Sequence, residues 1–272
     1  MTQKTVAIVG YGAVGRSIGR LFPDAVAYDG PLNIGSRDAV NASQFAFVAV
    51  PTPARFDGSC DCSTVDEVVG WIESEIIIIR STVEVGTTER LRRETGKRII
   101  FQPEYGPGET PDHHFRDPRT ARWVILGGER ADTIPVADLY KTTFNAELVI
   151  QQTDSRTAEL TKYMENCFLA LKVTFCHEFY DIATAVGVDY NELRELWLLD
   201  PRIGRSHTFV NPEERGFGGK CLPKDLTALI HTAISSGYTP ALLQAALAAN
   251  AAMRHEDAAT LNPAGLRWGV TP

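Results

Sequence analysis

Short runs of apolar and β-branched residues alternate with amphipathic segments along the first half of the chain. The apolar runs predict β-strands at residues 5–9, 25–28, 45–50, 76–80, 98–101, 123–126 and 147–150. Between them, apolar residues at helical spacing predict helices at residues 14–21, 64–72, 87–94 and 131–142. Strands that alternate with helices are typical of βαβ units, so we expect a parallel sheet covered on both faces.

The pattern changes near residue 152. From Ser155 to Val186, roughly 32 residues, neither Pro nor Gly interrupts a helical pattern, and Gly187 then ends it. Residues 167–175 in its middle are apolar on nearly every face except at Lys172, which predicts burial on several sides. Such a helix is about 48 Å long, longer than a small domain is wide. We therefore expect it to be the spine of a helical domain and to reach a subunit contact.

These elements divide the chain into two expected domains and a tail: a sheet domain at residues 1–151, a helical domain at 152–258 and a tail at 259–272. The fold class is therefore α/β, a parallel-sheet domain followed by an all-helical domain. An Asp189-x-x-Glu192 capping box predicts a shorter helix that ends before Pro201, and two more helices are expected at 223–236 and 240–255. Residues 106–119, rich in Pro, Gly and polar residues, predict a long functional or mobile loop.

Composition is that of an ordinary globular protein, with 44% hydrophobic and 22% charged residues among 272. No apolar run approaches the ~18 residues of a membrane span. The apolar stretch at residues 6–9 is too short for a signal-peptide core, so we expect a cytoplasmic protein without a membrane partner. The formal net charge of −7 argues against a nucleic-acid partner, and the basic residues between 90 and 98 are expected to form a solvated face.

Neither a disulfide framework nor a metal site is expected. Five cysteines are an odd number in a chain without an export signal. The close pair Cys60 and Cys62 has no second pair at zinc spacing, and we interpret both as ordinary loop residues. His113 and His114 also lack the spaced carboxylate and histidine pattern of a metal site.

Residues 6–15 read VAIVGYGAVG, a GxGxxG motif between a predicted strand and a predicted helix. Gly10 permits the tight turn, Gly12 lets the backbone approach a pyrophosphate, and Gly15 allows close packing of helix on strand. The helix N-terminus offers unpaired N–H groups to the phosphates. Asp29 ends the next predicted strand, where a carboxylate accepts hydrogen bonds from the adenosine ribose and repels a 2′-phosphate. The pattern predicts an NAD site in preference to NADP; the alternative is a glycine-rich turn without a ligand.

Residues 216–225 read GFGGKCLPKD. Pro223 suits the first turn of a helix, so Cys221 is expected immediately before a helix N-terminus and close to Lys220 and Lys224. The helix dipole and the ammonium charges favour the thiolate, which is the nucleophilic form. The other cysteines of the second half, Cys167 and Cys176, are expected to be small buried hydrophobic residues.

Lys162 and Asn166 lie four residues apart on the predicted long helix and therefore share a face. In a cleft they could hold an oxyanion or polarise a carbonyl. Such a pair taken alone is more often part of a solvated face.

Seven motifs occur in order between residues 5 and 255: VAIVGYGAVG, VAVPTP followed by Asp57, Gly58 and Asp61, IIIIRSTVEVGTT, QPEY, AELTKYMENCFLALK, DPRIG and GFGGKCLPKD. Together they resemble the nucleotide-sugar 6-dehydrogenases, the UDP-glucose and GDP-mannose 6-dehydrogenase family. The resemblance implies an NAD-binding Rossmann-like domain and a helical domain around a long dimer-forming helix. It also implies oxidation of a primary alcohol to a carboxylate with two NAD in succession.

The resemblance assigns catalytic roles to particular residues. Cys221 would attack the aldehyde to give a thiohemiacetal and, after the second hydride transfer, a thioester. Lys162 would stabilise the oxyanion, and Glu104 would be the general base of thioester hydrolysis. Asn166, Asp225 and Thr82 would position a water or the substrate oxygen, with Asp225 also in proton transfer.

The resemblance also implies binding residues. The expected cofactor-binding residues are Gly10, Gly12, Ala13, Val14, Gly15, Asp29, Pro51, Thr52, Ser81 and Thr82. The expected substrate-binding residues are Arg202, Tyr105, Phe217 and Gly218. Arg202 would reach a substrate bound in the neighbouring subunit of a homodimer.

The chain departs from the family pattern in ways that leave the substrate open. Family members continue into a third domain that helps to bind the nucleotide, and this chain is expected to be a short member without it. Lys220 replaces the serine that is usual in the family. Residues 106–109 replace a leucine-and-acid segment that touches the sugar, with Glu109 as a candidate for the missing acid. Two acidic residues, Glu213 and Glu214, stand where the family often presents small or basic residues to the diphosphate. The substrate is thus a nucleotide sugar or a smaller hydroxymethyl compound. The alternatives are a two-electron β-hydroxyacid-type dehydrogenase, which needs no cysteine, and a non-catalytic NAD-binding paralogue.

Overall fold

The computed structural model describes residues 4–106, 118–144 and 147–255. The chain forms two compact units, which are described separately below. Unit 1 comprises Met1–Pro53 and Asp61–Lys162, and unit 2 comprises Ala54–Cys60 and Tyr163–Pro272. The sequence did not indicate that the segment Ala54–Cys60 leaves the first half of the chain to join the second unit.

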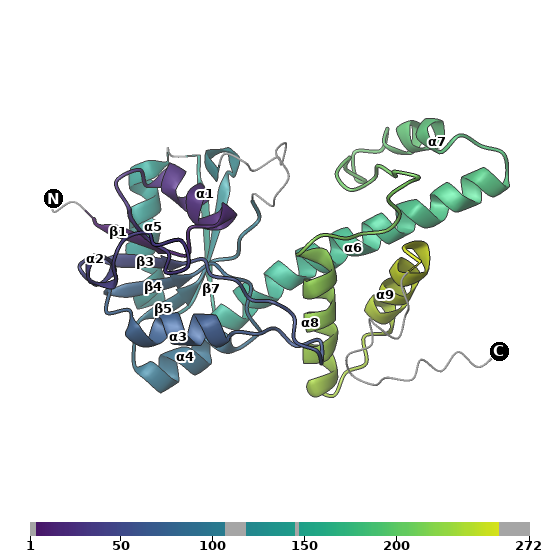
Figure 1. Ribbon diagram of the computed structural model, residues 1–272. Helices are drawn as coiled ribbons and strands as arrows, with labels where there is room; N and C mark the ends of the chain where they lie inside the picture. The colour runs from purple at the N-terminus through teal and green to yellow at the C-terminus, as the bar shows by residue number, and fades with distance from the viewer. Residues whose placement is uncertain (1–3, 107–117, 145–146, 256–272) are drawn as a thin grey trace. The chain divides into compact units, whose positions relative to one another are not determined.

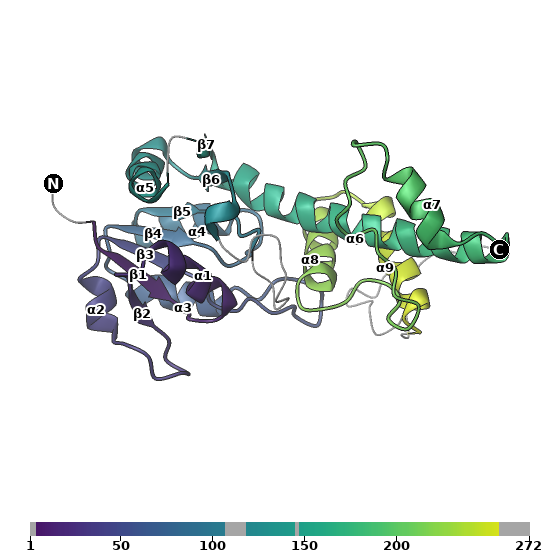
Figure 2. The ribbon, with the colours of Figure 1, turned by 90° about the horizontal axis from the view of Figure 1, so that it is seen from above.

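Unit 1 is built on a seven-stranded sheet in the order β2-β1-β3-β4-β5-β6-β7, which Figure 2 shows from above. The strands are β1 (Val6–Val9), β2 (Val26–Tyr28), β3 (Phe45–Val48), β4 (Ile76–Ile79), β5 (Ile99–Phe101), β6 (Trp123–Gly127) and β7 (Val149–Thr153). Every residue of β1, β3, β4 and β5 is buried. Such continuous apolar strands are typical of a sheet covered on both faces, as the sequence predicted.

The sheet differs from the expected all-parallel sheet at one junction. Each neighbouring pair is parallel except β5 and β6, which pair antiparallel through Phe101 and Gly127. A parallel neighbour needs a long crossover, usually a helix, to return the chain to the other edge of the sheet. The described residues of this connection contain only the short 3₁₀ turn Pro118–Thr120, so β6 starts at the edge where β5 ends and runs in the opposite direction.

Helices cover both faces of this sheet (Figure 1). They are α1 (Ala13–Leu21), α2 (Arg37–Asn41), α3 (Ser63–Trp71), α4 (Thr87–Thr95) and α5 (Arg130–Thr143). Side chains of α1 and α5, among them Ile18, Val136 and Tyr140, form one core with β1, β3 and β4, while α3 and α4 lie on the opposite face. The sequence did not predict α2, because five residues give little more than one turn of periodicity.

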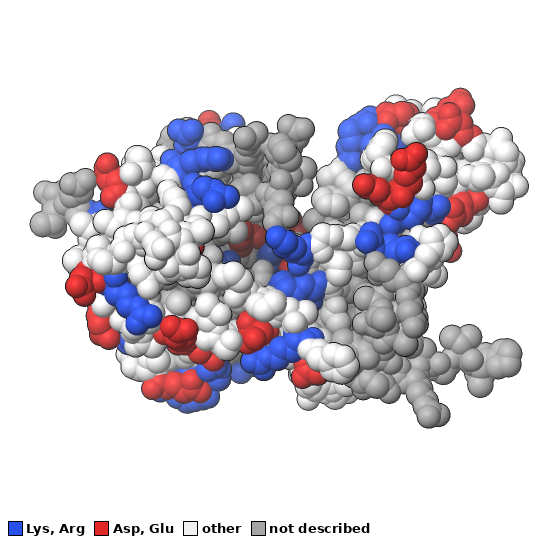
Figure 3. Space-filling view, viewed as in Figure 1, with Lys and Arg blue, Asp and Glu red and all other residues white. Residues whose placement is uncertain are grey.

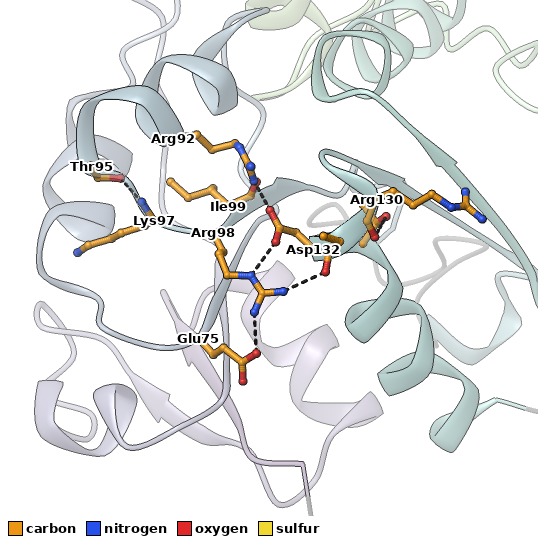
Figure 4. Close-up of polar contacts among 10 residues, drawn as sticks. Glu75, Arg92, Thr95, Lys97, Arg98, Ile99, Arg130 and Asp132 are labelled. Carbon is orange, nitrogen blue, oxygen red and sulfur yellow. Dashed lines mark hydrogen bonds and ion pairs between the residues drawn. The ribbon is translucent and has the colours of Figure 1, made fainter.

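The basic residues between 90 and 98 are paired rather than merely solvated (Figure 4). Asp132, in the first turn of α5, accepts hydrogen bonds from Arg92 and from Nε of Arg98, the latter at 2.7 Å. Arg98 also pairs with Glu75 at 2.6 Å. Lys97 donates to the carbonyl oxygens of Val69, Gly70 and Ile72. It thereby supplies a donor at the C-terminal end of α3, where the last carbonyl oxygens of a helix lack partners within the helix. These contacts join α3, α4, α5 and the start of β5.

Unit 2 is helical. Its helices are α6 (Ser155–Ala185), whose first turns belong to unit 1, α7 (Tyr190–Trp197), α8 (Leu222–Ser235) and α9 (Ala241–Met253). One core joins α6, α8 and α9 around Cys167, Leu226 and Leu247. The single charged residue in the apolar part of α6, Lys172, donates to the carbonyl oxygens of Ile203 and Gly204 at 2.9 and 2.7 Å, and so anchors the loop after α7.

The next features concern membrane-spanning helices, surface charge and metal-binding groups among the described residues. None of the helices in the described ranges has the length and apolarity needed to cross a membrane. On the face drawn in Figure 3, acidic and basic side chains are interspersed. Among the described residues, no group of three or more His, Cys, Asp and Glu side chains is arranged to hold a metal ion.

Candidate active site

The glycine-rich turn between β1 and α1 has the backbone that a pyrophosphate requires. Gly10 has φ +91°, and a Cβ there would lie 2.5 Å from the carbonyl oxygen of Ala49. A Cβ on Gly15 would lie 2.0 Å from the carbonyl oxygen of Gly10. At Gly12, by contrast, the Cβ position has no atom within 4 Å, and no side chain caps the N-terminus of α1 within the described residues. This end of α1 therefore has both the space and the N–H groups for an anionic ligand.

Asp29 lies directly beside this turn. Its Oδ2 accepts a hydrogen bond of 2.8 Å from the amide of Tyr11, and its Oδ1 accepts one of 3.1 Å from the amide of Leu32. Because each carboxylate oxygen accepts more than one hydrogen bond, capacity remains for ribose hydroxyls. Half-buried at the end of β2, Asp29 is placed as the sequence predicted for the residue that distinguishes NAD from NADP.

The segments that follow β3 and β4 are cross-linked at the same edge of the sheet. Thr52 donates from Oγ1 to the carbonyl oxygen of Thr82 at 2.7 Å, and Ser81 donates from Oγ to the carbonyl oxygen of Val50 at 2.7 Å. The chain passes from β1 to β2 on one side and then to β3 on the other, which makes a topological switch point at the carboxyl ends of the strands. The expected cofactor residues Pro51, Thr52, Ser81 and Thr82 lie at this edge.

Glu104, which follows β5, forms a buried ion pair with Arg80, which follows β4. Its Oε1 also accepts a hydrogen bond of 2.6 Å from the amide of Gly106. Burial lowers the pKa of Arg80, but the charge of Glu104, together with Tyr140 and the hydrogen bonds to both side chains, raises that pKa above its ordinary value. Glu104, Tyr105 and Trp123 line a pocket of unit 1. The arrangement places the Glu104 carboxylate at the wall of a cavity.

Lys162 is buried rather than part of a solvated face, and its Nζ lies 5.3 Å from the centre of the Tyr105 ring. The start of α6 is fixed by Glu159, which accepts hydrogen bonds from the amide of Gly86 at 2.5 Å and from the amide and hydroxyl of Thr88 at 2.9 and 2.6 Å. Burial raises the pKa of Glu159. Unit 1 thus brings together two of the expected residues, the ammonium group of Lys162 and the ring of Tyr105.

Asn166, one turn after Lys162 on α6, contacts Asp225 in unit 2. Its Nδ2 donates to Oδ2 of Asp225 at 2.5 Å, and Nζ of Lys224 lies 2.6 Å from Oδ1 of the same carboxylate. All three side chains are largely shielded from solvent. Burial lowers the pKa of Lys224, but the Asp225 carboxylate outweighs it and raises that pKa. The expected Asn166 and Asp225 therefore belong to one buried polar cluster.

Cys221 is the one exposed cysteine of the five; Cys60, Cys62, Cys167 and Cys176 are buried. It is the N-cap residue of α8, with Pro223 in the first turn, as its sequence context predicted. Burial, together with the Asp225 carboxylate, raises the pKa of Cys167 to about 12. The accessible thiol of Cys221 lies at the positive end of the α8 helix dipole, three residues before Lys224 and four before Asp225.

The remaining expected substrate residues have other contacts in the structure. The Phe217 ring is buried in the core of unit 2, and a Cβ on Gly218 would lie 2.9 Å from the guanidinium of Arg254. Arg202 is exposed and pairs with Asp200 at 2.5 Å. Glu109, His113, His114 and the tail at 259–272 lie outside the described residues.

Sequence reasoning missed Arg80 and Glu159. Arg80 carries a weak signal, since a charged residue directly after a fully apolar strand needs a partner. Glu159 carries none, because its partners at the start of α4 are 71 residues or more away in the sequence.

Two family models match the chain. The NAD binding domain of the UDP-glucose/GDP-mannose dehydrogenase family matches residues 25–144, and the central domain of the same family matches residues 156–252. The chain belongs to this family. NAD is accordingly the cofactor of its sheet domain, and the glycine turn and Asp29 fit that cofactor.

Individual relatives agree with this assignment. The chain is 31% identical over 227 residues to the UDP-glucose 6-dehydrogenase of Rhizobium meliloti (strain 1021), covering 79% of this chain and 51% of the relative. It matches the structure of a UDP-glucose dehydrogenase from Pyrobaculum islandicum with a TM-score of 0.79 and 27% identity, over 91% of this chain and 68% of that one. The chain spans about half the length of the curated relatives it matches.

The fold is also shared with a 3-hydroxyisobutyrate dehydrogenase of Mycobacterium tuberculosis. The TM-score is 0.66 at 15% identity, over 97% of this chain and all of that one. At this identity the likeness concerns the fold alone.

Proposed function

We propose that the protein oxidises a primary alcohol, a hydroxymethyl group of the sugar C6 type carried by a nucleotide sugar or a smaller compound, to a carboxylate. The observation that carries this proposal is the accessible thiol of Cys221 at the start of α8, four residues before the buried carboxylate of Asp225, which contacts Asn166 and Lys224. A single hydride transfer from an alcohol needs no nucleophile, whereas oxidation to an acid needs a means of holding the aldehyde.

The reaction removes two hydrides and adds one water. When bound, NAD accepts a hydride in each of two oxidations. The Cys221 thiolate adds to the aldehyde carbon, and a C–S bond forms while the carbonyl oxygen becomes an oxyanion. Lys162 stabilises that oxyanion by its charge. Asp225, held by Asn166, receives or returns the proton of the substrate oxygen.

The second oxidation converts the thiohemiacetal of Cys221 into a thioester, and hydrolysis of this thioester completes the reaction. Glu104 accepts a proton from the attacking water, and Thr82, Asn166 and Asp225 orient the water or the substrate oxygen. The C–S bond breaks, the carboxylate leaves and the Cys221 thiolate is restored. The contacts with Arg80 and with the amide of Gly106 support the role of Glu104, because they fix the position of the carboxylate at the pocket wall.

Binding roles complete the proposal. The NAD pyrophosphate is placed at Gly10, Gly12, Ala13, Val14 and Gly15, the ribose at Asp29, and the rest of the cofactor along Pro51, Thr52, Ser81 and Thr82. The substrate is placed near Tyr105 and the Phe217–Gly218 backbone.

The active form is proposed to be a homodimer in which Arg202 reaches the neighbouring subunit's substrate. Apolar side chains are exposed along α6 at Met164, Phe168, Phe175, Phe179 and Ile182, and directly after its end at Val186; these six residues are here called the α6 stripe. Their spacing of three, four or seven residues places them on one helix face. A contiguous exposed apolar surface of this kind is typical of a protein interface.

Purified protein and NAD, assayed for NADH against UDP-sugars, GDP-sugars and simple sugars, test this function. We expect two NADH and one carboxylic acid per substrate, and Cys221→Ala should bind NAD but form no acid. One NADH per turnover with release of an aldehyde or ketone, unchanged in Cys221→Ala, would favour the two-electron dehydrogenase. NAD binding without turnover on any alcohol would favour the non-catalytic paralogue.

A further inference from the structure

The backbone that leads into the cysteine loop is held by two buried side chains from different helices. Nδ1 of His177, on α6, accepts a hydrogen bond of 3.0 Å from the amide of Gly216 and one of 3.1 Å from Nε of Arg215. Asn250, on α9, forms two hydrogen bonds with the backbone of Phe217: its Oδ1 accepts from the amide at 2.6 Å and its Nδ2 donates to the carbonyl at 3.0 Å. Residues 215–217 are thus fixed one after another, four residues before Cys221.

Burial makes these contacts hard to replace. His177 and Asn250 are 3% and 2% exposed, so a donor or acceptor that lost its partner there would have little access to water. The fit is close at Gly216, which has φ +73° and where a Cβ would lie 2.4 Å from Oδ1 of Asn250. Beyond Phe217 the backbone becomes permissive, since Gly218 and Gly219 precede Lys220 and Gly219 has φ +75°.

The contacts require a neutral His177 with its proton on Nε2, because Nδ1 accepts two hydrogen bonds. Burial lowers the pKa of His177, the charge of Arg215 lowers it further, and Asp181 opposes both. The Arg215 guanidinium is itself held by Asp181 at 2.7 Å and by the carbonyl oxygen of His177 at 3.2 Å. The guanidinium lies 5.0 Å from the centre of the Tyr180 ring. Arg254, the C-cap residue of α9, donates to the backbone carbonyl oxygen of Arg215 at 3.5 Å.

We propose that His177 and Asn250 are positioning residues for the cysteine nucleophile. They fix the backbone at Arg215–Phe217. The glycine turn that follows starts from this fixed point, which therefore helps to set the position of Cys221 at the start of α8. The inference rests on the proposed role of Cys221. It assigns a function to a histidine that has no part in the chemistry itself.

Amide hydrogen exchange of Gly216 and Phe217 in the full chain tests the contacts without reference to activity. His177→Leu removes the acceptor, whereas His177→Asn offers an amide oxygen near the place of Nδ1. We expect Gly216 to exchange about tenfold faster or more in His177→Leu and close to the wild-type rate in His177→Asn. The control is His231→Leu, which removes a partly exposed histidine of the same unit and should leave Gly216 unchanged.

Acid provides a second measurement. Because the pKa of His177 lies below the ordinary histidine value of about 6.5, only acidification well below that pH protonates His177 and removes the acceptor. Once corrected for intrinsic exchange, Gly216 should therefore lose protection on acidification in the wild type but not in His177→Asn. The contact would be overturned if the wild type and His177→Asn lost the same protection at Gly216 on acidification. It would also be overturned if Gly216 exchanged at the same rate in His177→Leu and His177→Asn.

The functional step is measured at the thiol and in turnover. Cys221 is the exposed cysteine, so iodoacetamide reports on it, and its alkylation rate should change about threefold or more in His177→Leu and be restored in His177→Asn. The kcat should fall about tenfold or more in His177→Leu and recover in His177→Asn, with the Kd for NAD unchanged. Faster Gly216 exchange with unchanged alkylation and kcat would overturn positioning. If the wild type oxidises no alcohol, the proposed function fails, while exchange and alkylation still decide this inference.

Discussion

Asn166 and Asp225 are 59 residues apart in the sequence and are joined by a hydrogen bond of 2.5 Å between two buried side chains. The amide donates to one oxygen of the carboxylate, and Lys224 lies against the other. One oxygen of this buried carboxylate is therefore hydrogen-bonded and the other lies in an ion pair, and a buried charge is tolerated when it has such partners. The contact also joins α6, which carries Lys162, to α8, which begins at Cys221.

Replacing Asn166 by Leu should destabilise the protein and slow turnover, because one oxygen of Asp225 loses its donor. Leaving a buried charged acceptor unpaired costs about 1–3 kcal/mol or more. Urea unfolding should show a lower midpoint, and kcat should fall with little change in the Kd for NAD. Glu178→Gln, an exposed change on the same helix, is the control. An unchanged midpoint in Asn166→Leu would show that the hydrogen bond contributes nothing.

The ion pair between Arg80 and Glu104 predicts a non-additive pair of substitutions. Arg80→Met leaves Glu104 buried without its counter-ion, and breaking a buried pair in this way costs about 3–5 kcal/mol. Arg80→Met with Glu104→Gln should be more stable than Arg80→Met alone, because the uncompensated charge is gone. Urea unfolding of Arg80→Met, of Glu104→Gln and of the double variant measures the coupling between the two side chains. Additive losses would mean that the two side chains do not depend on each other.

Asp29 predicts the choice of cofactor. In the proposed binding mode its carboxylate faces the adenosine ribose, so the 2′-phosphate of NADP would meet a like charge. The wild type should bind NAD at least about tenfold more tightly, a difference of about 1.4 kcal/mol. Asp29→Asn retains an oxygen for the Tyr11 amide and should narrow the preference. Fluorescence titration measures both constants, and equal affinity of the wild type for the two cofactors would contradict the assignment.

Local patterns explain why so much of the fold could be predicted from the sequence. The seven strands, the long α6 and the glycine turn each depend on residues close together in the chain. The position of Cys221 also has a local signal, because Pro223 marks the first turn of α8.

The unpredicted features depend on distant residues. The antiparallel β5–β6 pair depends on a connection without a recognisable pattern, and the membership of Ala54–Cys60 in unit 2 depends on packing. His177 and Gly216 are 39 residues apart, and neither position has a periodicity that reveals its partner. A buried histidine in an apolar helix is also compatible with an ordinary core position.

Asp132 predicts part of the pH dependence of stability. Burial raises the pKa of its carboxyl, but hydrogen bonds from Arg92 and Arg98 outweigh burial, so the pKa lies below its ordinary value. A depressed pKa in the folded state adds stability above the unfolded value of about 3.9, and this stability is lost as the pH falls through the folded value. Asp132→Asn should cost about 1–3 kcal/mol at pH 7 and less below about pH 4. Urea unfolding at both pH values measures this. The control is Asp138→Asn, which changes an exposed carboxylate of the same helix, and a cost independent of pH would contradict the argument.

The α6 stripe predicts that a charge on this helix separates the proposed dimer. Phe168 is 60% exposed in the single chain, yet it belongs to the stripe of apolar side chains along one face of α6. Across a dimer contact its replacement by Glu would bury an unpaired carboxylate, a cost large enough to favour the monomer. Light scattering at micromolar concentration should find the wild type as a dimer, or a multiple of one, and Phe168→Glu as a smaller species with the same far-UV spectrum. Glu178→Gln, which lies outside the stripe, should behave like the wild type. A monomeric wild type would remove both the dimer and the proposed reach of Arg202 into a neighbouring subunit.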